Sequence, residues 1–175
     1  MSDDFAQDER RKQELAGRPI ADAIYRRVLQ ATSIRRFDDE AAEEHILDRK
    51  YGIDAEVKLP CGMVLTLQEK FLSHEHSRYN SVTIEHMQDP ETGEVGDWGR
   101  LAAQLYFIAY YDAQGTGFEK WAILSMDGLV LATQLGKVQW TDNSNKDGHA
   151  RASFRWADVA RLPERCRWYQ HGFSN

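Results

Sequence analysis

Three side chains in one short stretch of this chain could hold a divalent cation and activate a water molecule against a phosphodiester bond. They are Asp54, Gln68 and Lys70, and they lie in the segment DRKYGIDAEVKLPCGMVLTLQEK, residues 48–70. Carboxylate and amide oxygens are ligands that Mg²⁺ and Mn²⁺ accept. A lysine ammonium can orient the water or stabilise the negative charge that develops in the transition state. This chemistry requires that the three side chains share one face of the local structure.

A β-hairpin would bring the three side chains onto one face. Residues 53–59 and 63–70 alternate between apolar and polar side chains, which is typical of strands with one buried face. Between them, Pro60 suits the second position of a type I turn, and Gly62 suits the left-handed position that closes a three-residue loop. The apolar pairs that this loop predicts are Leu59 with Met63, Val57 with Leu65 and Ala55 with Leu67.

The same register predicts which polar side chains meet. Asp54 lies opposite Gln68. Lys70 lies on that face too, whereas Glu69 points to the other face. A two-residue turn would pair Asp54 with Glu69 instead, but it would break the apolar match between the strands. A simpler alternative stays open, in which the hairpin is amphipathic and its polar face is only solvated.

The order GID, strand turn, QEK resembles the core of the PD-(D/E)xK nuclease superfamily. In that superfamily an Asp begins one strand and a (D/E)xK triplet lies on the next. The resemblance covers about residues 38–130. The triplet here is Gln68-Glu69-Lys70, and this Gln-x-Lys form is similar to that of the endonuclease subunit of some cut-and-paste transposons. A neutral amide is a weaker ligand for a hard cation than a carboxylate.

The resemblance implies a metal site that an acid on the preceding helix completes. Asp54 and Gln68 would hold Mg²⁺ or Mn²⁺, with the backbone carbonyl of Glu69 as an additional ligand. The superfamily often has a Glu on this helix, and Glu43 falls near the middle of its apolar stripe. Asp48, near the end of the helix, is a ligand, a supporting acid or a surface charge. The expected catalytic set is therefore Asp54, Gln68, Lys70, Glu43 and Asp48, with Asp54, Gln68 and Glu43 on the metal.

The elements around the hairpin follow an αβββαβ order. Together with the resemblance, this order implies a restriction-endonuclease-like α/β core with a mixed central sheet flanked by helices. A helix is expected to begin at Pro19, after a segment 3–16 that is either helical or a loose arm. A second helix is expected from Asp38 or Asp39 to about Gly52. The segment SVTIEH, residues 81–86, predicts a third strand by its alternation.

The second half of the chain predicts the remaining core elements. Residues 105–112, LYFIAYYD, are apolar enough on both faces for a central buried strand. A further strand is expected from Trp121, and a helix follows it and closes at Gly136. Residues 141–149 predict a polar loop, and residues 155–167 predict a short helix broken at Pro163.

Length and composition predict one globular domain. The chain has 175 residues, of which 42% are hydrophobic and 29% charged. Its core is expected over about residues 38–136, with an N-terminal helical extension over 1–37 and a C-terminal basic and aromatic extension over 137–175. No apolar run is long enough to span a membrane, so no membrane partner is expected. The absence of a signal-peptide core and the distance between the two cysteines favour the cytoplasm.

Two classes of function are compatible with these features. The first is a metal-dependent endonuclease or exonuclease that hydrolyses DNA phosphodiester bonds, with a phage or a mobile element as one conceivable origin. The second is a catalytically inactive nuclease-like fold that acts as a nucleic-acid-binding or protein-assembly module. The net charge of −6 argues against binding through bulk electrostatics. DNA is the expected partner, and a homodimer or larger assembly stays open.

A zinc site is the weaker alternative for the chemistry. His74, His76 and His86 include a His-x-His pair that zinc could use, but no further ligand lies at suitable spacing. These histidines therefore favour a polar strand end or loop.

Overall fold

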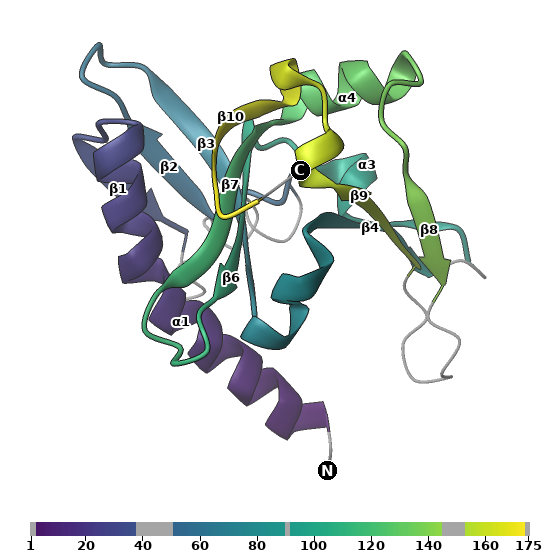
Figure 1. Cartoon of the computed structure of the whole chain (residues 1–175), viewed down its shortest axis with the longest axis horizontal. Coiled ribbons are helices and arrows are strands. Elements are labelled where there is room, and N and C mark those ends of the chain that lie inside the picture. Colours follow the sequence, from purple (N-terminus) through teal and green to yellow (C-terminus); the bar gives the residue numbers. More distant parts are fainter. Residues whose placement is uncertain (1–2, 38–50, 90–91, 145–152, 174–175) are drawn as a thin grey trace.

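The computed structural model describes residues 3–37, 51–89, 92–144 and 153–173. Figure 1 shows a central sheet with a long helix, α1 (Asp3–Val28), along one face and a second, smaller sheet to the other side. Within the described ranges, no helix is long and apolar enough to cross a membrane. The second helix that the sequence predicts falls mostly in residues 38–50, which lie outside the described residues.

The central sheet is mixed, which confirms the α/β class that the sequence predicts. Its strand order is β1-β2-β3-β6-β7-β10. Strands β3 and β6 pair in parallel, and the other neighbouring strands pair antiparallel. The strand bounds are β1 Ser33–Arg36, β2 Ala55–Lys58, β3 Val64–Leu72, β6 Leu105–Tyr111, β7 Phe118–Ser125 and β10 Arg167–His171.

The hairpin of β2 and β3 has the predicted register. Ala55 pairs with Leu67, and Val57 pairs with Leu65. The turn is closed at Gly62, which has φ of 87° and donates its amide hydrogen to the carbonyl of Leu59. An L-residue with a side chain rarely adopts this φ, so the glycine sets the loop length and with it the register.

Strand β6 is the central buried strand that the sequence predicts. All seven of its residues are buried. Leu105, Phe107 and Ala109 share the face that packs against α1. The contacts from the helix include Tyr25, whose ring meets that of Phe107 edge to face at a centroid distance of 5.1 Å. Full burial of a side chain such as Phe107 stabilises the fold by about 2–3 kcal/mol.

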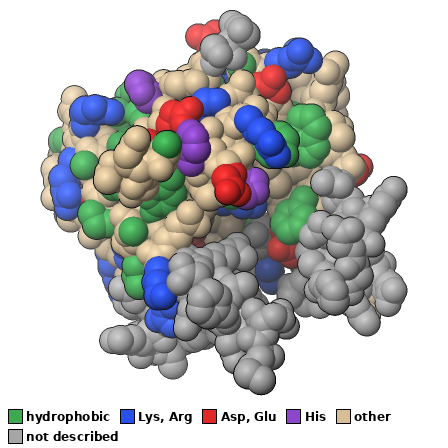
Figure 2. All heavy atoms as spheres, turned by 60° about the horizontal axis from the view of Figure 1, so that its bottom comes forward, with side chains coloured by type: hydrophobic (Ala, Val, Ile, Leu, Met, Phe, Trp, Pro, Cys, Tyr) green, Lys and Arg blue, Asp and Glu red, His purple; other side chains and the backbone are tan. Residues whose placement is uncertain are grey.

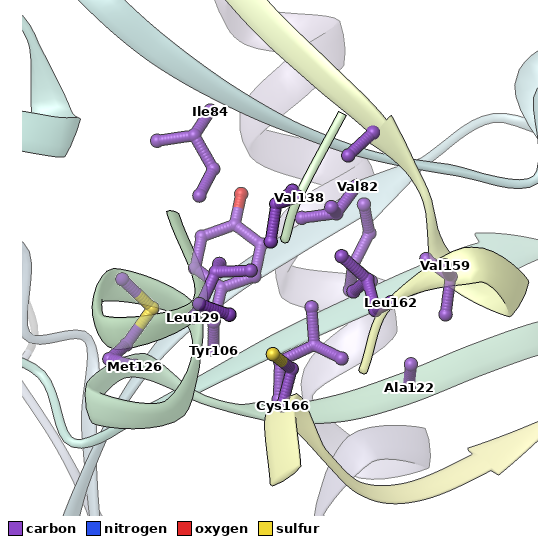
Figure 3. Packing of buried hydrophobic residues seen from close by; sticks show 14 of the residues in the cluster. Val82, Ile84, Tyr106, Ala122, Met126, Leu129, Val138, Val159, Leu162 and Cys166 are labelled. Carbon is purple, nitrogen blue, oxygen red and sulfur yellow. The ribbon is translucent and has the colours of Figure 1, made fainter. Parts of the chain in front are cut away.

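The opposite face of β6 packs against the second sheet and helix α4 (Met126–Gln134). Figure 3 shows Tyr106 of β6 lying among Ile84, Val138 and Leu129. The second sheet has the strand order β5-β4-β9-β8. Its strands are β4 Ser81–Asp89, β5 Glu94–Val95, β8 Thr141–Ser144 and β9 Ser153–Asp158. The short helices are α3 Asp97–Arg100 and the 3₁₀ turns η1 His74–Tyr79, η2 Val159–Arg161 and η3 Glu164–Cys166.

The predicted third strand forms, but it does not join the hairpin. Residues 81–89 form β4, which pairs with β9 and β5 in the second sheet. The second edge of β3 is taken by β6 instead, and β1 adds the third antiparallel strand beside β2. The alternation of a strand predicts that it has a buried face, but its partners are set by the rest of the chain.

The predicted start of the first helix at Pro19 is wrong, because α1 runs through this proline from Asp3 to Val28. A proline inside a helix removes one backbone hydrogen bond, so packing must hold the helix together here. At Gly17 an added Cβ would lie 2.6 Å from the Tyr111 hydroxyl and 2.7 Å from the Phe71 ring. The Tyr111 hydroxyl also donates to the carbonyl of Gln13. This close contact with the sheet keeps the helix continuous around Pro19.

The short helix predicted over residues 155–167 is also wrong in its first part. Residues 153–158 form β9, and the 3₁₀ turns η2 and η3 stand on either side of Pro163. The predicted loop from Thr141 begins as strand β8. The described part of residues 137–175 therefore contributes strands to both sheets, and β10 forms an edge of the central sheet.

The two cysteines differ enough in environment to predict selective labelling. Both are free thiols, and Cys61 is exposed whereas Cys166 is fully buried. Burial raises the pKa of the Cys166 thiol, although Arg165 and Arg167 oppose the shift. Because the thiolate is the reactive form, we expect native protein to take up one equivalent of a thiol reagent at Cys61. The second equivalent should react only in denaturant, and mass spectrometry of the labelled peptides measures both.

Candidate functional site

Asp54 lies just before β2, with its carboxylate over the triplet on β3. Its backbone amide donates to the carbonyl of Leu67 at 2.8 Å. Its Oδ2 accepts a hydrogen bond of 2.6 Å from the backbone amide of Glu69. The carboxylate is thus fixed against the backbone between Gln68 and Lys70.

Gln68 lies one step beyond the Ala55–Leu67 pair, where the regular pairing of β2 with β3 ends and the Asp54 amide bonds to Leu67. Its Oε1 is buried and has no hydrogen-bond partner among the described residues. Leaving a buried acceptor unsatisfied costs about 1–3 kcal/mol, so such an atom marks a place where something polar is expected to bind. The amide stands against Gly52, where an added Cβ would come within 3.5 Å of Nε2.

Lys70 lies on the same face of β3, two residues further along. Its Nζ donates to the backbone carbonyl of Thr83 on β4 at 3.1 Å and lies 5.6 Å from the centroid of the Phe154 ring on β9. The Tyr106 hydroxyl donates to the same carbonyl at 3.0 Å. Lys70 therefore satisfies the backbone carbonyl of Thr83 in the second sheet. This contact is structural and is separate from a catalytic role.

Glu69 points to the other face, as predicted, and is part of a buried ion pair. Its carboxylate contacts the Arg36 guanidinium and accepts a hydrogen bond of 2.7 Å from the Tyr25 hydroxyl. The side chains of Arg36 and Glu69 are only 12% and 4% exposed. Arg36 also contacts Asp22 of α1. Glu69 thus links α1 and the edge strand β1 to β3, through Tyr25 and Arg36.

The two groups that contact Glu69 both have raised pKa values. Burial lowers the pKa of the Arg36 guanidinium, but the charge and hydrogen bond of Glu69, with those of Asp22, raise it above its ordinary value. Burial and the neighbouring Glu69 charge both raise the pKa of the Tyr25 phenol well above its usual range. Tyr25 therefore stays protonated and remains a hydrogen-bond donor to Glu69.

Of the other residues considered from the sequence, the structure describes the histidines but not the two helix acids. Glu43 and Asp48 lie outside the described residues. His74 contacts Glu119 at 2.9 Å, and His76 contacts the Ser73 hydroxyl at 2.8 Å. Among the described residues, no three His, Cys, Asp or Glu side chains lie close enough together to hold a metal ion. His74 and His76 both lie in the 3₁₀ turn η1.

Sequence reasoning missed the neighbours of Lys70. Phe154 and Trp156 were placed at or near a helix, but they lie two residues apart on one face of β9. The alternation of aromatic with other side chains in SFRWAD is the signal that could have found this strand. These rings and Lys70 border a cavity of about 500 Å³ between the two sheets.

Comparison of the chain with models of known protein families, with curated proteins and with solved structures gave no match. The site is therefore interpreted from its own geometry.

Proposed function

We propose that this chain is a metal-dependent nuclease that hydrolyses phosphodiester bonds in DNA, with Asp54, Gln68 and Lys70 at its centre. The observation that carries the proposal is the buried Oε1 of Gln68, which has no hydrogen-bond partner among the described residues, next to the Glu69 amide that binds the Asp54 carboxylate. Buried acceptors are nearly always satisfied in folded proteins. A hard divalent cation is a partner that accepts an amide oxygen and a carboxylate together.

The donor set fits Mg²⁺ or Mn²⁺. Asp54 supplies a charged oxygen and Gln68 a neutral one, and the resemblance implies Glu43 as a third. A cation bound there would polarise the phosphoryl oxygen and lower the pKa of a bound water. The Glu69 amide holds the Asp54 carboxylate in place. Lys70 directs its ammonium to the negative charge that develops on the phosphate, which is the role of a preorganised donor.

The order of elements supports a restriction-endonuclease-like core as part of this proposal. Helix α1 precedes three antiparallel strands, β1 to β3, and β6 then pairs in parallel with β3. The crossover from β3 to β6 contains η1, β4, β5 and the four-residue α3. Two strands of the second sheet, β4 and β5, are thus inserted at the crossover, and Lys70 contacts β4.

A catalytically inactive binding module is the second candidate. The observation that favours it is the hydrogen bond from Lys70 to Thr83, which gives this lysine a structural task. A neutral amide at Gln68 also makes a weaker metal ligand than a carboxylate. In this alternative the chain binds DNA or a protein without cutting DNA.

Cleavage of a mixed DNA panel separates the two candidates. Supercoiled, linear, branched and single-stranded DNA are each incubated with the purified chain in Mg²⁺, Mn²⁺ or EDTA. The proposal expects metal-dependent cleavage of at least one substrate and none in EDTA. If none of the substrates is cut in either metal while the chain is folded by circular dichroism, the inactive module is favoured.

The metal site itself is tested by Gln68→Glu, which replaces the neutral ligand with a charged one. We expect this variant to unfold at a lower temperature than wild type in EDTA, because it buries a second carboxylate beside Asp54. Mn²⁺ should restore its stability, by about 2.7 kcal/mol at a hundredfold excess over the dissociation constant. Thermal unfolding with and without Mn²⁺ measures both effects.

The matched control for this substitution is Gln139→Glu, at an exposed position between α4 and β8. Its unfolding temperature should change little in EDTA and should show no added response to Mn²⁺. Equal responses of the two variants to Mn²⁺ would place the cation elsewhere than at Gln68.

A further inference from the structure

The cavity between the two sheets combines aromatic walls with a positive charge. Its volume is about 500 Å³, which is within the usual range for small-molecule sites. Four aromatic side chains line it, and they come from three parts of the fold: Tyr79 of η1, Tyr110 of β6, and Phe154 and Trp156 of β9. Tyr79 and Trp156 remain 54% and 38% exposed. Large aromatic rings thus stand at the cavity with much of their surface still in contact with water.

The aromatic rings are spaced for a planar ligand. Phe154 and Trp156 are two residues apart on one strand, and Trp156 pairs with Thr83, another lining residue. Side chains at this spacing are about 7 Å apart. A ring placed between two aromatic side chains needs about 3.5 Å on each side, because carbon atoms are in contact at about that distance. One planar ring could therefore contact an aromatic side chain on each side.

The charges at the cavity select an anion. Lys70 lines it, with its ammonium 5.6 Å from the centroid of the Phe154 ring. The chain carries 28 Asp and Glu residues, yet none of the described residues that line this cavity is acidic. Glu85 pairs with Phe154 on the same sheet face but does not line the cavity. A ligand that has a planar ring and a negative group a short distance away matches both features.

We propose that this cavity binds one unstacked nucleotide of single-stranded DNA, with its base against Phe154 and Trp156 and its phosphate toward Lys70. The proposal deepens the proposed function and rests on it, because Lys70 belongs to both the cavity and the nuclease site. Base stacking on aromatic side chains tolerates any sequence, since every base has a π-face. The substrate class is then a single strand, or a duplex end or branch with an unpaired nucleotide.

The surface charge agrees with local rather than extended binding. On the face shown in Figure 2, the described basic, acidic and hydrophobic side chains are interspersed, and the coloured basic groups there form no continuous surface. A protein with a net charge of −6 gains little from bulk attraction to phosphates. Most of the affinity for DNA should then come from the few nucleotides that reach the cavity.

The test measures binding in the absence of cleavage. The dissociation constant of a fluorescent twelve-nucleotide single strand (roughly the span that one single-strand-binding module covers) is determined by anisotropy in EDTA at fixed salt. We expect Trp156→Ala to raise this constant about tenfold, as the loss of one stacking platform does. Trp168→Ala is the matched control, because Trp168 is 44% exposed on β10 and does not line the cavity. It should change the constant by less than about twofold.

A second variant keeps the test valid if Trp156→Ala fails to fold by circular dichroism. Tyr79→Ala removes a ring that is 54% exposed and lies on a different element. It should also weaken binding of the single strand. Unchanged binding in the folded variants of both Trp156 and Tyr79 overturns the proposal.

Two further ligands identify the source of the nucleotide. A blunt duplex of the same length should bind more weakly than the single strand and should be insensitive to Trp156→Ala. If free dAMP or dTMP binds in a Trp156-dependent way while the strand does not, the cavity is a site for free nucleotides and the strand proposal is wrong.

Trp156-dependent binding without cleavage in any metal would support the cavity and reject the nuclease. If wild type cleaves DNA but Trp156→Ala binds the single strand as tightly as wild type does, the nuclease is supported and the cavity proposal is rejected.

Discussion

Replacing Lys70 with alanine should lower the rate of metal-dependent DNA cleavage by about 100-fold or more, because it removes a positive group positioned for the developing phosphate charge. The variant should fold, since one hydrogen bond to the Thr83 carbonyl contributes only about 0.5–1.5 kcal/mol. Initial rates on the best substrate of the panel measure the effect. Circular dichroism and thermal unfolding establish that the variant is folded under the assay conditions.

The structure offers a control that separates the two tasks of Lys70. The Tyr106 hydroxyl donates to the same Thr83 carbonyl, so Tyr106→Phe removes a hydrogen bond to this acceptor and leaves the ammonium in place. This variant should cleave at nearly the wild-type rate. A loss of cleavage as large as that of Lys70→Ala would mean that Lys70 acts by holding β4, not by contacting the phosphate.

The companion substitution at the proposed metal ligand is Asp54→Asn. The asparagine oxygen can still accept the hydrogen bond from the Glu69 amide, so the local fold should persist. The charge that binds the cation is lost, and cleavage should be lost with it. Cleavage that survives in both Asp54→Asn and Lys70→Ala would place the active site elsewhere in the chain.

The hairpin that carries these residues could be predicted from the sequence because its determinants are local. Gly62 has the left-handed φ that a three-residue loop requires, and the apolar alternation of both strands agrees with only one register. Strand β6 was predictable for a similar reason, since an apolar pattern on both faces belongs to a strand covered on both sides. The faces of Gln68, Glu69 and Lys70 follow directly from that register.

The second sheet could not be predicted, because its pairing is not local. The alternation of residues 81–86 correctly indicates a strand, but it contains no information that β9 is the partner or that β6 takes the open edge of β3. Strand β1 was missed since a four-residue strand with two arginines resembles a loop. Its Arg36 is buried only because Glu69 and Asp22, from two other elements, neutralise it.

The candidate site shows the same division between local and distant information. The prediction that Asp54 faces Gln68 uses the hairpin alone. The contacts of Lys70 depend on β4 and β9, which meet it from distant parts of the sequence. The lysine could therefore be assigned to the correct face, but its hydrogen bond to Thr83 and the aromatic cavity beside it appear only in the folded chain.

The largest effect on stability is expected at Glu69, which the register separates from the site. Glu69→Gln removes the charge that faces Arg36 in a part of the protein where both side chains are almost fully buried. Breaking a buried ion pair leaves an uncompensated charge and costs about 3–5 kcal/mol. Because Asp22 still contacts Arg36, we expect a loss near the lower end, about 3 kcal/mol. Urea unfolding monitored by circular dichroism measures the change in the free energy of unfolding.

The matched control is Glu14→Gln, which breaks an exposed ion pair with Arg18 four residues along α1. Such pairs contribute about 0.5 kcal/mol or less, so its unfolding curve should nearly overlay that of wild type.

The two variants also test which acid belongs to the metal site. If Glu69 only holds α1 and β1 to the sheet, the folded fraction of Glu69→Gln should cleave DNA at close to the wild-type rate, despite its lower stability. If Glu69→Gln is instead as stable as Glu14→Gln but no longer cleaves DNA, Glu69 is the metal ligand. The assignment of Glu69 to the face away from the site would then be wrong.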